Sequence, residues 1–319
     1  MAPSILLIGG SGYLGQFLTN DFRRRGWQVV YTRHSAQPLP PYDLDAQCFH
    51  AELASGEGLA RCFQAFDGQI DAVINCAAVS QPAACERDQA YARSINVPST
   101  LLDALDAHAA QHGAEPLLVQ LSTDQVYDGS SASGAFTELD PCAPVNAYGR
   151  SKVEGEQAVA RRWRRHVILR SSLIYGSDPP LAPVGRSLFL QFVDDVLAAG
   201  TPTSFFTDEW RCPVFVGDVV SVCAALVERH SGGAGGTDMY GVYNMGGSQR
   251  LSRMERAQAR ATLRGYDPAL LLAAPAAALD RGFYSPADTS MDSQKLCKLL
   301  GLQMRTFDEG LALALALSS

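Results

Sequence analysis

Short apolar runs alternate with longer amphipathic stretches through the first half of the chain. The strand-like runs are expected at 4–9, 27–32, 47–53, 71–75, 117–121 and 167–170. A helical pattern follows the first run to about Arg25, and longer ones cover about 86–112 and 146–164. Strands that are apolar on both faces are typical of a parallel sheet with helices on each side. The pattern therefore predicts an α/β fold with a Rossmann-type, doubly wound parallel sheet.

The alternation loosens in the second half of the chain. Proline and glycine cluster at 176–185, and the glycine-rich segment at 231–236 predicts a flexible surface loop. An earlier proline-rich loop is expected at 38–41, before the third strand. The interrupted pieces after the sixth strand predict a smaller C-terminal region beside the sheet.

Composition and charge describe an ordinary globular protein of 319 residues, with 47% hydrophobic and 18% charged residues. A net charge of -7 argues against binding to nucleic acids or anionic membranes, since both require a basic face. The apolar runs are shorter than the ~18 residues of a membrane span, and the first strand begins too early for a leader peptide. The eight cysteines form no CxxC pair and the histidines are scattered, so we expect reduced thiols, no metal site and a cytosolic protein.

A glycine-rich segment directly follows the first predicted strand and opens a helix, with glycines at a GxxGxxG spacing. Glycine permits the tight turn, the close approach of the backbone to a pyrophosphate, and the close packing of helix on sheet. The free N–H groups at the start of the helix then attract the phosphates. The motif predicts a dinucleotide site that includes Gly9, Ser11, Gly12, Tyr13, Leu14 and Gly15.

The end of the second strand predicts which dinucleotide binds. An acidic residue at this place would hold the ribose 2′-hydroxyl of NAD, but the chain has Tyr-Thr-Arg-His at 31–34. Arg33 can pair with a 2′-phosphate, which favours NADP(H) as the cofactor. Glu52 and Leu53, at the end of the third strand, are expected near the adenine.

Tyr148 and Lys152 are four residues apart in a predicted helix, so their side chains share one face. An ammonium near a phenol favours the phenolate and lowers the pKa of the tyrosine toward the range of a general acid/base. Ser122, Thr123 and Asp124 follow the fifth strand, at the sheet edge where parallel sheets bind ligands. A YxxxK pair is common by chance, but together with the glycine turn and these residues it predicts a proton-transfer site.

These motifs together resemble the extended short-chain dehydrogenases/reductases, and within them the dTDP-4-dehydrorhamnose reductase group. That group also contains the methionine adenosyltransferase β-subunit type of protein. The segments that carry the resemblance are 74–78, 94–97, 121–129, 148–152, 168–176 and 216–220. They span nearly the whole chain, and the segment Leu-Ser-Thr-Asp-Gln-Val-Tyr-Asp-Gly at 121–129 is the most specific of them.

The resemblance implies an NADPH-dependent reductase of a 4-keto nucleotide sugar, with Thr123, Tyr148 and Lys152 as its catalytic residues. Tyr148 would protonate the C4 carbonyl oxygen as hydride reaches C4, and Lys152 would hold the nicotinamide ribose and tune the tyrosine. Thr123 would hydrogen-bond the substrate oxygen, and Asp124 would orient the sugar. The cofactor backbone would pass along Cys76, Ala77 and Ala78. Residues 1–172 would form the NADP(H)-binding domain, and 173–319 mostly the substrate-binding region, with segments that return to the first domain.

The substrate half departs from the reductase pattern. Leu173 stands where those enzymes tend to carry Trp, and Ser-Pro-Ala-Asp at 285–288 replaces an Arg-Pro-x-Asn pattern. Arg211 is expected at the substrate, and Trp210 can line the same pocket or simply pack. Two alternatives therefore stay open: an NADP(H)-binding regulatory subunit that joins a methionine adenosyltransferase catalytic subunit, or a nucleotide-sugar epimerase or dehydratase. A homodimer is equally open.

Overall fold

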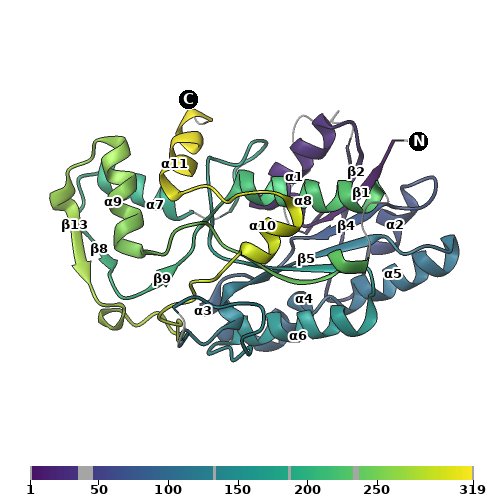
Figure 1. The fold of residues 1–319 in the computed structure, drawn as a ribbon, viewed down its shortest axis with the longest axis horizontal. Coiled ribbons are helices and arrows are strands. Elements are labelled where there is room, and N and C mark those ends of the chain that lie inside the picture. Colours follow the sequence, from purple (N-terminus) through teal and green to yellow (C-terminus); the bar gives the residue numbers. More distant parts are fainter. Residues whose placement is uncertain (1, 35–45, 132–133, 186–187, 233–236, 318–319) are drawn as a thin grey trace.

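A parallel β-sheet forms the centre of the larger lobe of the computed structural model (Figure 1). Within the described residues it has seven strands in the order β11-β6-β5-β4-β1-β2-β3, each parallel to its neighbours. The strands are β1 (Ser4–Ile8), β2 (Gln28–Arg33), β3 (Ala46–His50), β4 (Ala72–Asn75), β5 (Leu117–Thr123), β6 (His166–Ser171) and β11 (Gly241–Met245). The structure describes residues 2–34, 46–131, 134–185, 188–232 and 237–317. The predicted loop at 38–41 lies outside these ranges, as does most of the one at 231–236.

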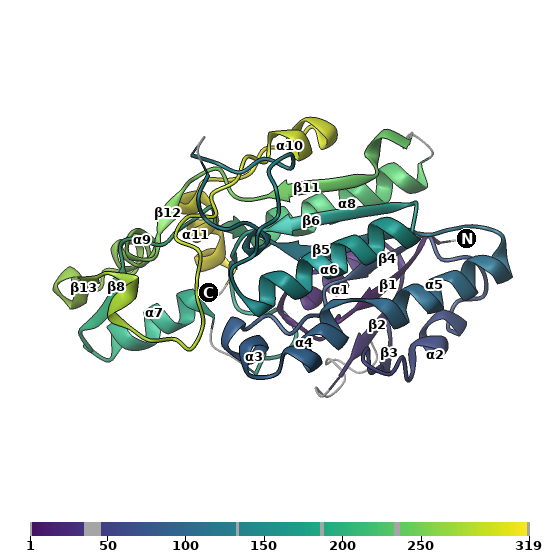
Figure 2. The same cartoon turned by 90° about the horizontal axis from the view of Figure 1, so that it is seen from below.

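Both faces of the sheet are buried under helices (Figures 1 and 2). Side chains of β1 alternate between the two faces, so that Ile5 and Leu7 pack in one core and Leu6 and Ile8 in the other. The first face is covered by α1 (Tyr13–Arg24) and α8 (Val216–Ser231), and the second by α2 (Leu59–Gln64), α5 (Ser99–His112) and α6 (Ala147–Arg162). This arrangement confirms the α/β fold with a doubly wound parallel sheet.

The helical pattern predicted over 86–112 is divided into separate helices, which corrects that prediction. The pieces are α3 (Pro82–Arg87), α4 (Gln89–Asn96) and α5. Asp88 leaves the helical conformation and its carboxylate accepts a hydrogen bond from the amide of Tyr91, capping α4. Val97 is extended because it precedes Pro98, and the α conformation is disfavoured before a proline.

A smaller lobe lies beyond the carboxyl ends of the sheet strands (Figure 2). It contains α7 (Phe189–Ala198), β8 (Thr203–Phe206), α9 (Arg253–Arg264) and β13 (Leu271–Ala274). Its own core is formed by Val193, Leu197, Phe205, Ala257, Ala261 and Leu271. Two short strand pairs lie near it, β7 (Ile174–Tyr175) with β10 (Val214–Phe215) and β9 (Trp210–Arg211) with β12 (Leu251–Ser252).

The chain passes between the lobes several times, which fixes them side by side. After β8 it returns to the sheet through α8 and β11, and then enters the smaller lobe again at α9. On its way back, the segment 285–291 forms bridges from Asp288 to Trp210 and from Met291 to Phe136. Finally, α10 (Gln294–Leu300) packs on α8 and β11, and α11 (Phe307–Ala316) packs on α9 and β10.

Candidate active site

A cleft of about 1090 Å³ lies between the carboxyl ends of the sheet strands and the smaller lobe. Its sheet side is formed by the residues that follow β1 and β4 and by the ends of β5 and β6. Its other side comes from α7, α9 and the segments around 209–211 and 281–285. Open α/β sheets bind their ligands at this edge, so the cleft is the candidate active site.

The glycine turn leaves little room for side chains, and least where it packs against the sheet. Gly9 has φ +79°, and a Cβ on Gly15 would lie 2.3 Å from the carbonyl oxygen of Gly9. A Cβ on Gly10 would lie 2.5 Å from Cβ of Tyr31. At the N-cap Gly12, by contrast, such an atom would meet only Gly9 O, at 3.2 Å. The turn packs against β1 and β2 and faces the cleft with bare backbone.

The first turn of α1 offers its amides to the cleft. Its N-cap Gly12 has no side chain to accept a hydrogen bond, and the turn contains no acidic residue. Gly12, Tyr13, Leu14 and Gly15 line the cleft, and the hydroxyl of Tyr13 donates to Ser177 O at 3.0 Å. An uncapped helix start with a positive dipole end fits the pyrophosphate of a dinucleotide.

Five of the residues predicted to bind the cofactor lie outside the cleft wall. Ser11, Arg33, Glu52, Leu53 and Ala77 are not among its lining residues. The Glu52 carboxylate accepts from the amide of Ala54 at 3.0 Å and lies 2.7 Å from His34. These contacts lower the pKa of Glu52, the amide of Ala54 most strongly. The predicted roles of Arg33 at the 2′-phosphate and of Glu52 and Leu53 at the adenine stay predictions. The same holds for Ser11 in the glycine turn and for Ala77 along the cofactor backbone.

Of the three residues predicted to follow the cofactor after β4, Cys76 and Ala78 line the cleft. Burial raises the pKa of the Cys76 thiol to about 12, so it is neutral and a poor nucleophile. The loop that they begin is fixed by Asn96 of α4, whose side-chain oxygen accepts from the amide of Val79 at 2.9 Å. Asn96 also donates to Ser151 Oγ at 2.8 Å, which ties the loop to α6.

The structure brings Thr123, Tyr148 and Lys152 together in the wall of the cleft. Asn146 caps α6 by accepting from the amide of Gly149 at 2.9 Å, so Tyr148 lies in the first turn and Lys152 one turn later. Lys152 is only 3% exposed and its Nζ donates to Leu121 O at 2.6 Å. Burial lowers its pKa to about 8, although the nearby carboxylate of Glu156 acts in the opposite direction.

Thr123 and Asp124 form a hydrogen-bonded pair at the end of β5. The Thr123 hydroxyl donates to Asp124 Oδ1 at 3.1 Å and accepts from the amide of Gln125 at 3.2 Å. The second oxygen of Asp124 accepts from Ser172 at 3.1 Å and from Thr289 at 2.9 Å. The carboxylate therefore joins β5, the end of β6 and the segment 285–291.

A buried polar network behind the catalytic candidates escaped the sequence analysis. Glu156 accepts from Ser122 Oγ at 2.5 Å and pairs with Arg170 of β6, whose Nη2 lies 2.8 Å from Glu156 Oε2. Arg170 also donates to the hydroxyl of Tyr127 at 3.0 Å, which in turn donates to Asn244 Oδ1 at 2.7 Å. The signals in the sequence were a Glu four residues after Lys152 and an Arg inside an apolar strand.

The two residues predicted to contact substrate from β9 differ in position. Trp210 is absent from the cleft wall; the guanidinium of Arg250 stacks on its ring, with Cζ 3.8 Å from the ring centroid. A role of Trp210 at the substrate therefore stays a prediction, beside the packing against Arg250. Arg211 does line the cleft, but its guanidinium donates to Pro286 O at 2.9 Å and Ser285 Oγ at 3.1 Å, which fixes the segment 285–291.

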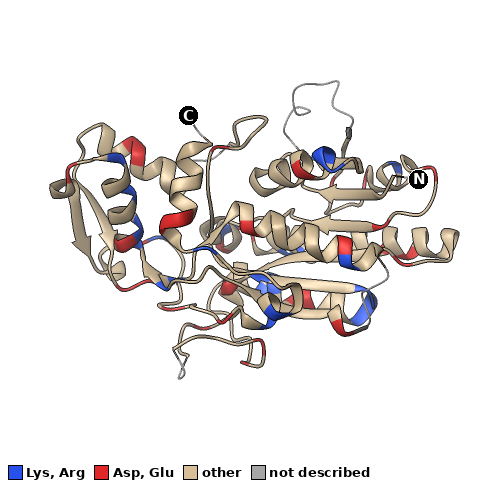
Figure 3. Cartoon of the chain, turned by 45° about the horizontal axis from the view of Figure 1, so that its top comes forward, with Lys and Arg blue, Asp and Glu red and all other residues tan. Residues whose placement is uncertain are grey.

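The smaller lobe adds charged groups to the cleft that the sequence analysis did not select. They are Glu209, Arg253, Arg256 and Arg281. Arg281 pairs with Glu209 through bonds of 2.5 and 3.1 Å. Arginines recur along α9 in this lobe (Figure 3). Their regular helical spacing was the available signal.

A family model described as RmlD substrate binding domain matches residues 3–319. The chain belongs to this family. A probable low-salt glycan biosynthesis reductase, Agl14, of Haloferax volcanii is 29% identical over 308 residues, which cover 96% of this chain and 95% of that protein. Methionine adenosyltransferase 2 subunit beta of Xenopus tropicalis is 28% identical over 253 residues, or 78% of this chain and 69% of its own length.

A solved structure has the same fold as this RmlD-family chain. It is a dTDP-4-dehydrorhamnose reductase from Bacillus anthracis in complex with NADP, with a TM-score of 0.78 and 21% identity. The match covers 99% of both chains. At this identity the likeness establishes the shared fold.

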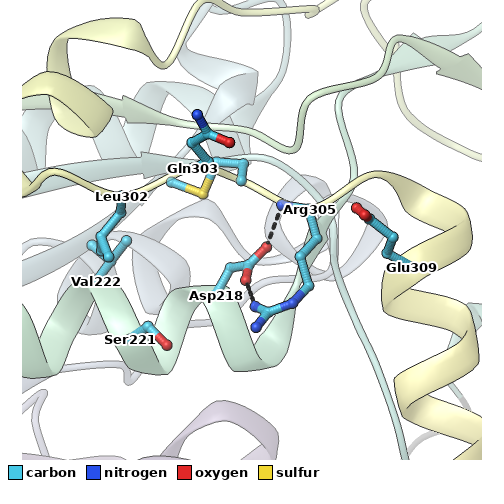
Figure 4. A pocket seen from close by; sticks show the side chains of 8 residues that line it. Asp218, Ser221, Val222, Leu302, Gln303, Arg305 and Glu309 are labelled. Atoms are coloured by element: carbon cyan, nitrogen blue, oxygen red, sulfur yellow. Dashed lines mark hydrogen bonds and ion pairs between the residues drawn. The ribbon is translucent and has the colours of Figure 1, made fainter.

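A second, smaller pocket of the RmlD-family chain, of about 330 Å³, lies between α8 and the segment before α11 (Figure 4). Its charged groups are already matched: Asp218 accepts from the amide of Arg305 at 2.9 Å and pairs with the guanidinium of the same residue. Glu309 completes the N-cap of α11 by accepting from the amide of Thr306 at 2.8 Å. These bonds attach the C-terminal segment to α8, so we assign the pocket a structural role.

The part of the RmlD-family chain that the structure describes contains neither a candidate metal site nor a candidate membrane-spanning helix. No three His, Cys, Asp or Glu side chains gather there as a metal ion would require. The same residues contain no helix with the length and apolar character needed to cross a membrane.

Proposed function

We propose that the chain is an NADPH-dependent reductase of a 4-keto nucleotide sugar, similar to the dTDP-4-dehydrorhamnose reductases. The observation that carries this proposal is that Thr123, Tyr148 and Lys152 line the same cleft as the glycine turn. The relatives support it, because the Haloferax protein is named as a reductase and the Bacillus reductase holds NADP.

The residues of the glycine turn fit the cofactor. The backbone from Gly12 to Gly15 and the start of α1 would hold the pyrophosphate, and Cys76 and Ala78 would flank the rest of the dinucleotide. We assign Arg33 to the 2′-phosphate, and Glu52 and Leu53 to the adenine side. When bound, the reduced nicotinamide supplies the hydride.

The protein side of the reaction is a proton transfer. Tyr148 would donate its phenolic proton to the carbonyl oxygen at C4, where negative charge develops. The Lys152 ammonium would stabilise the phenolate that remains and hold the nicotinamide ribose. Thr123 would turn its hydroxyl from Asp124 toward the substrate oxygen, and Asp124 would help orient the sugar through the hydroxyls around it.

A turnover assay tests the proposal. The purified protein is mixed with NADPH and either dTDP-4-dehydrorhamnose or its UDP counterpart, and the absorbance of the reduced nicotinamide is followed. We expect the absorbance to fall with one of the two sugars. Tight binding of NADPH without oxidation by either sugar would refute the reductase.

A second candidate function is that of an NADP(H)-binding regulatory subunit. The observation that favours it is the similarity to the β subunit of methionine adenosyltransferase 2 over 78% of this chain. In this case the protein should co-purify with a methionine adenosyltransferase catalytic subunit. Mixing the two proteins and measuring their mass in solution gives the answer, since separate elution would exclude this partner.

A further inference from the structure

Arginines follow one another along one face of α9. Arg253, Arg256, Arg260 and Arg264 have the spacing i, i+3, i+7 and i+11, which keeps side chains on one face of a helix. The two in the C-terminal half share the carboxylate of Asp194 of α7: Arg260 bonds to it at 2.9 and 2.5 Å, and the half-exposed Arg264 lies 3.9 Å away. The two in the N-terminal half line the cleft instead.

Arg253 and Arg256 lack the ionic partner that their neighbours on the helix have. Among the described residues, no ion pair involves either of them. Arg256 is only 4% exposed; its Nε donates to Ser252 O at 3.1 Å. Both guanidinium groups lie over the ring of Phe189, each with Cζ 4.8 Å from its centroid. One aromatic platform therefore presents two cations to the cleft.

This arrangement is unfavourable for the protein alone. Burial lowers the pKa of Arg256, and the charges of Arg253 and Arg211 lower it further. The carboxylates of Glu209 and Asp124 act in the opposite direction but do not offset the other causes. A buried charge without a counter-ion costs free energy. Cations in the first turn of a helix also face the positive end of its dipole. One turn later on the same helix face, the buried Arg260 has the carboxylate of Asp194 as its partner. For Arg253 and Arg256 we expect a ligand to supply the corresponding negative charge.

The other charged groups of this wall define what the ligand must carry. Arg281 is neutralised by Glu209, and the Nε of Arg211 lies 3.8 Å from Asp124 while its other nitrogens donate to the segment 285–291. The guanidinium groups of Arg253 and Arg256 thus remain as two positive charges without an ion-pair partner among the described residues. A diphosphate that links two groups carries two negative charges on adjacent phosphates, and planar guanidinium groups bind such oxygens well.

We propose that Arg253 and Arg256 bind the diphosphate of the nucleotide-linked substrate and make the cleft selective for diphosphates over monophosphates. The assignment rests on the proposed function, since it places a substrate across the cleft from the glycine turn to the smaller lobe. It adds a recognition site on α9 to the catalytic candidates of β5 and α6.

A titration of the protein saturated with NADP⁺ tests this assignment without any turnover. The probes are dTDP and UDP, with dTMP and UMP as the corresponding monophosphates, and heat release on binding is measured. We expect at least one diphosphate to bind about tenfold or more tightly than its monophosphate. Arg256→Gln should remove about that preference, while Arg260→Gln on the same helix face should keep it. Equal affinities, unchanged affinity in Arg256→Gln, or no binding of any probe would each overturn the assignment.

The unfolding temperature of the ligand-free variants gives an independent measurement. Arg256→Gln removes an unmatched charge and should unfold at the same or a higher temperature than the wild type. Arg260→Gln breaks the pair with Asp194 and should unfold at a lower one. If Arg256→Gln lowered the unfolding temperature as much as Arg260→Gln, the folded protein itself would already supply a partner for the Arg256 charge. Arg253→Gln, at a partly exposed position, repeats both measurements if Arg256→Gln does not fold.

The two proposals can fail separately. Selective binding of a diphosphate through Arg256, without oxidation of NADPH, would support the α9 site and reject the reductase. Turnover with a Michaelis constant unchanged in Arg256→Gln would support the reductase and reject the site.

Discussion

The two sides of the cleft differ in whether their buried charged groups have ion-pair partners. On the sheet side, Glu156 and Arg170 are both buried and neutralise one another through bonds of 2.8 and 3.1 Å. On the side of the smaller lobe, Arg253 and Arg256 have no such partner among the described residues. A network in which every polar group is hydrogen-bonded fixes the geometry around it. A preorganised charge without a partner in the protein can instead pair with a charged ligand.

This difference suggests a division of work between the walls. The satisfied network lies directly behind Ser122 and Lys152, so the residues proposed for proton transfer rest on a rigid base. The unmatched arginines lie on a helix of the smaller lobe and face the opposite end of the substrate. We infer that the sheet wall performs the chemistry and that the smaller lobe selects what is bound.

The largest effect is expected on turnover. Tyr148→Phe removes the proton that the sheet wall would donate but leaves the shape of the cleft unchanged. We expect kcat to fall by about 10²–10⁴-fold, with NADPH affinity within about twofold of the wild type. Steady-state kinetics and a fluorescence titration of NADPH measure the two quantities. Retention of full turnover would remove Tyr148 from the chemistry and with it the proposed division.

The next effect is on folding and tests the satisfied network. Glu156→Gln leaves the Arg170 charge buried without its partner, so we expect a loss of about 3–5 kcal/mol in the free energy of unfolding. Glu154, two residues earlier on α6, pairs with Arg93 at the surface, where the side chains are 43% and 68% exposed. Glu154→Gln is therefore the matched control and should cost at most about 1 kcal/mol. Urea denaturation measures the free energy of unfolding of both variants. Similar losses in the two would show that the buried pair contributes no more to stability than the surface pair.

The sequence was sufficient for those parts of the molecule that depend on local spacing. The apolar runs, the glycine turn and the Tyr148/Lys152 pair are each determined within a few residues, and they placed the sheet and its ligand edge. The division of the 86–112 pattern was missed because Pro98 and the cap Asp88 override a helical periodicity that otherwise continues.

The parts that escaped sequence analysis depend on contacts between distant segments. Glu156 meets Arg170 only because α6 crosses the sheet beside β5 and β6, and no local pattern relates the two positions. Arg256 reaches the cleft only after the chain has left the smaller lobe for α8 and β11 and entered it again. The stacking of Arg250 on the ring of Trp210 likewise joins distant segments and follows from no local pattern.

The buried ammonium of Lys152 makes stability depend on pH. Its pKa is lowered from 10.5 to about 8, so below pH 8 the folded protein bears the full cost of a charged lysine. Between these values the folded state releases its proton before the unfolded state does, and stability rises with pH. Between pH 7 and pH 11, the free energy of unfolding of the wild type should rise by on the order of 3 kcal/mol relative to that of Lys152→Met. Denaturation of both proteins at each pH measures this rise. If the unfolding free energies of the two proteins changed with pH in the same way, the pKa of Lys152 would not be lowered by folding.

The smallest effect concerns Arg33, which ends β2 on the sheet side but outside the cleft wall. If its guanidinium holds a 2′-phosphate, Arg33→Ala should lower the affinity for NADPH by about 10–100-fold and the affinity for NADH by less than about twofold. The reason is that NADPH carries the 2′-phosphate and NADH does not. Titration of both cofactors with the wild type and the variant measures the ratio. Equal losses would mean that Arg33 supports the fold of the turn instead. In that case the sheet wall would bind a dinucleotide without choosing between its forms, and selection would rest on the smaller lobe alone.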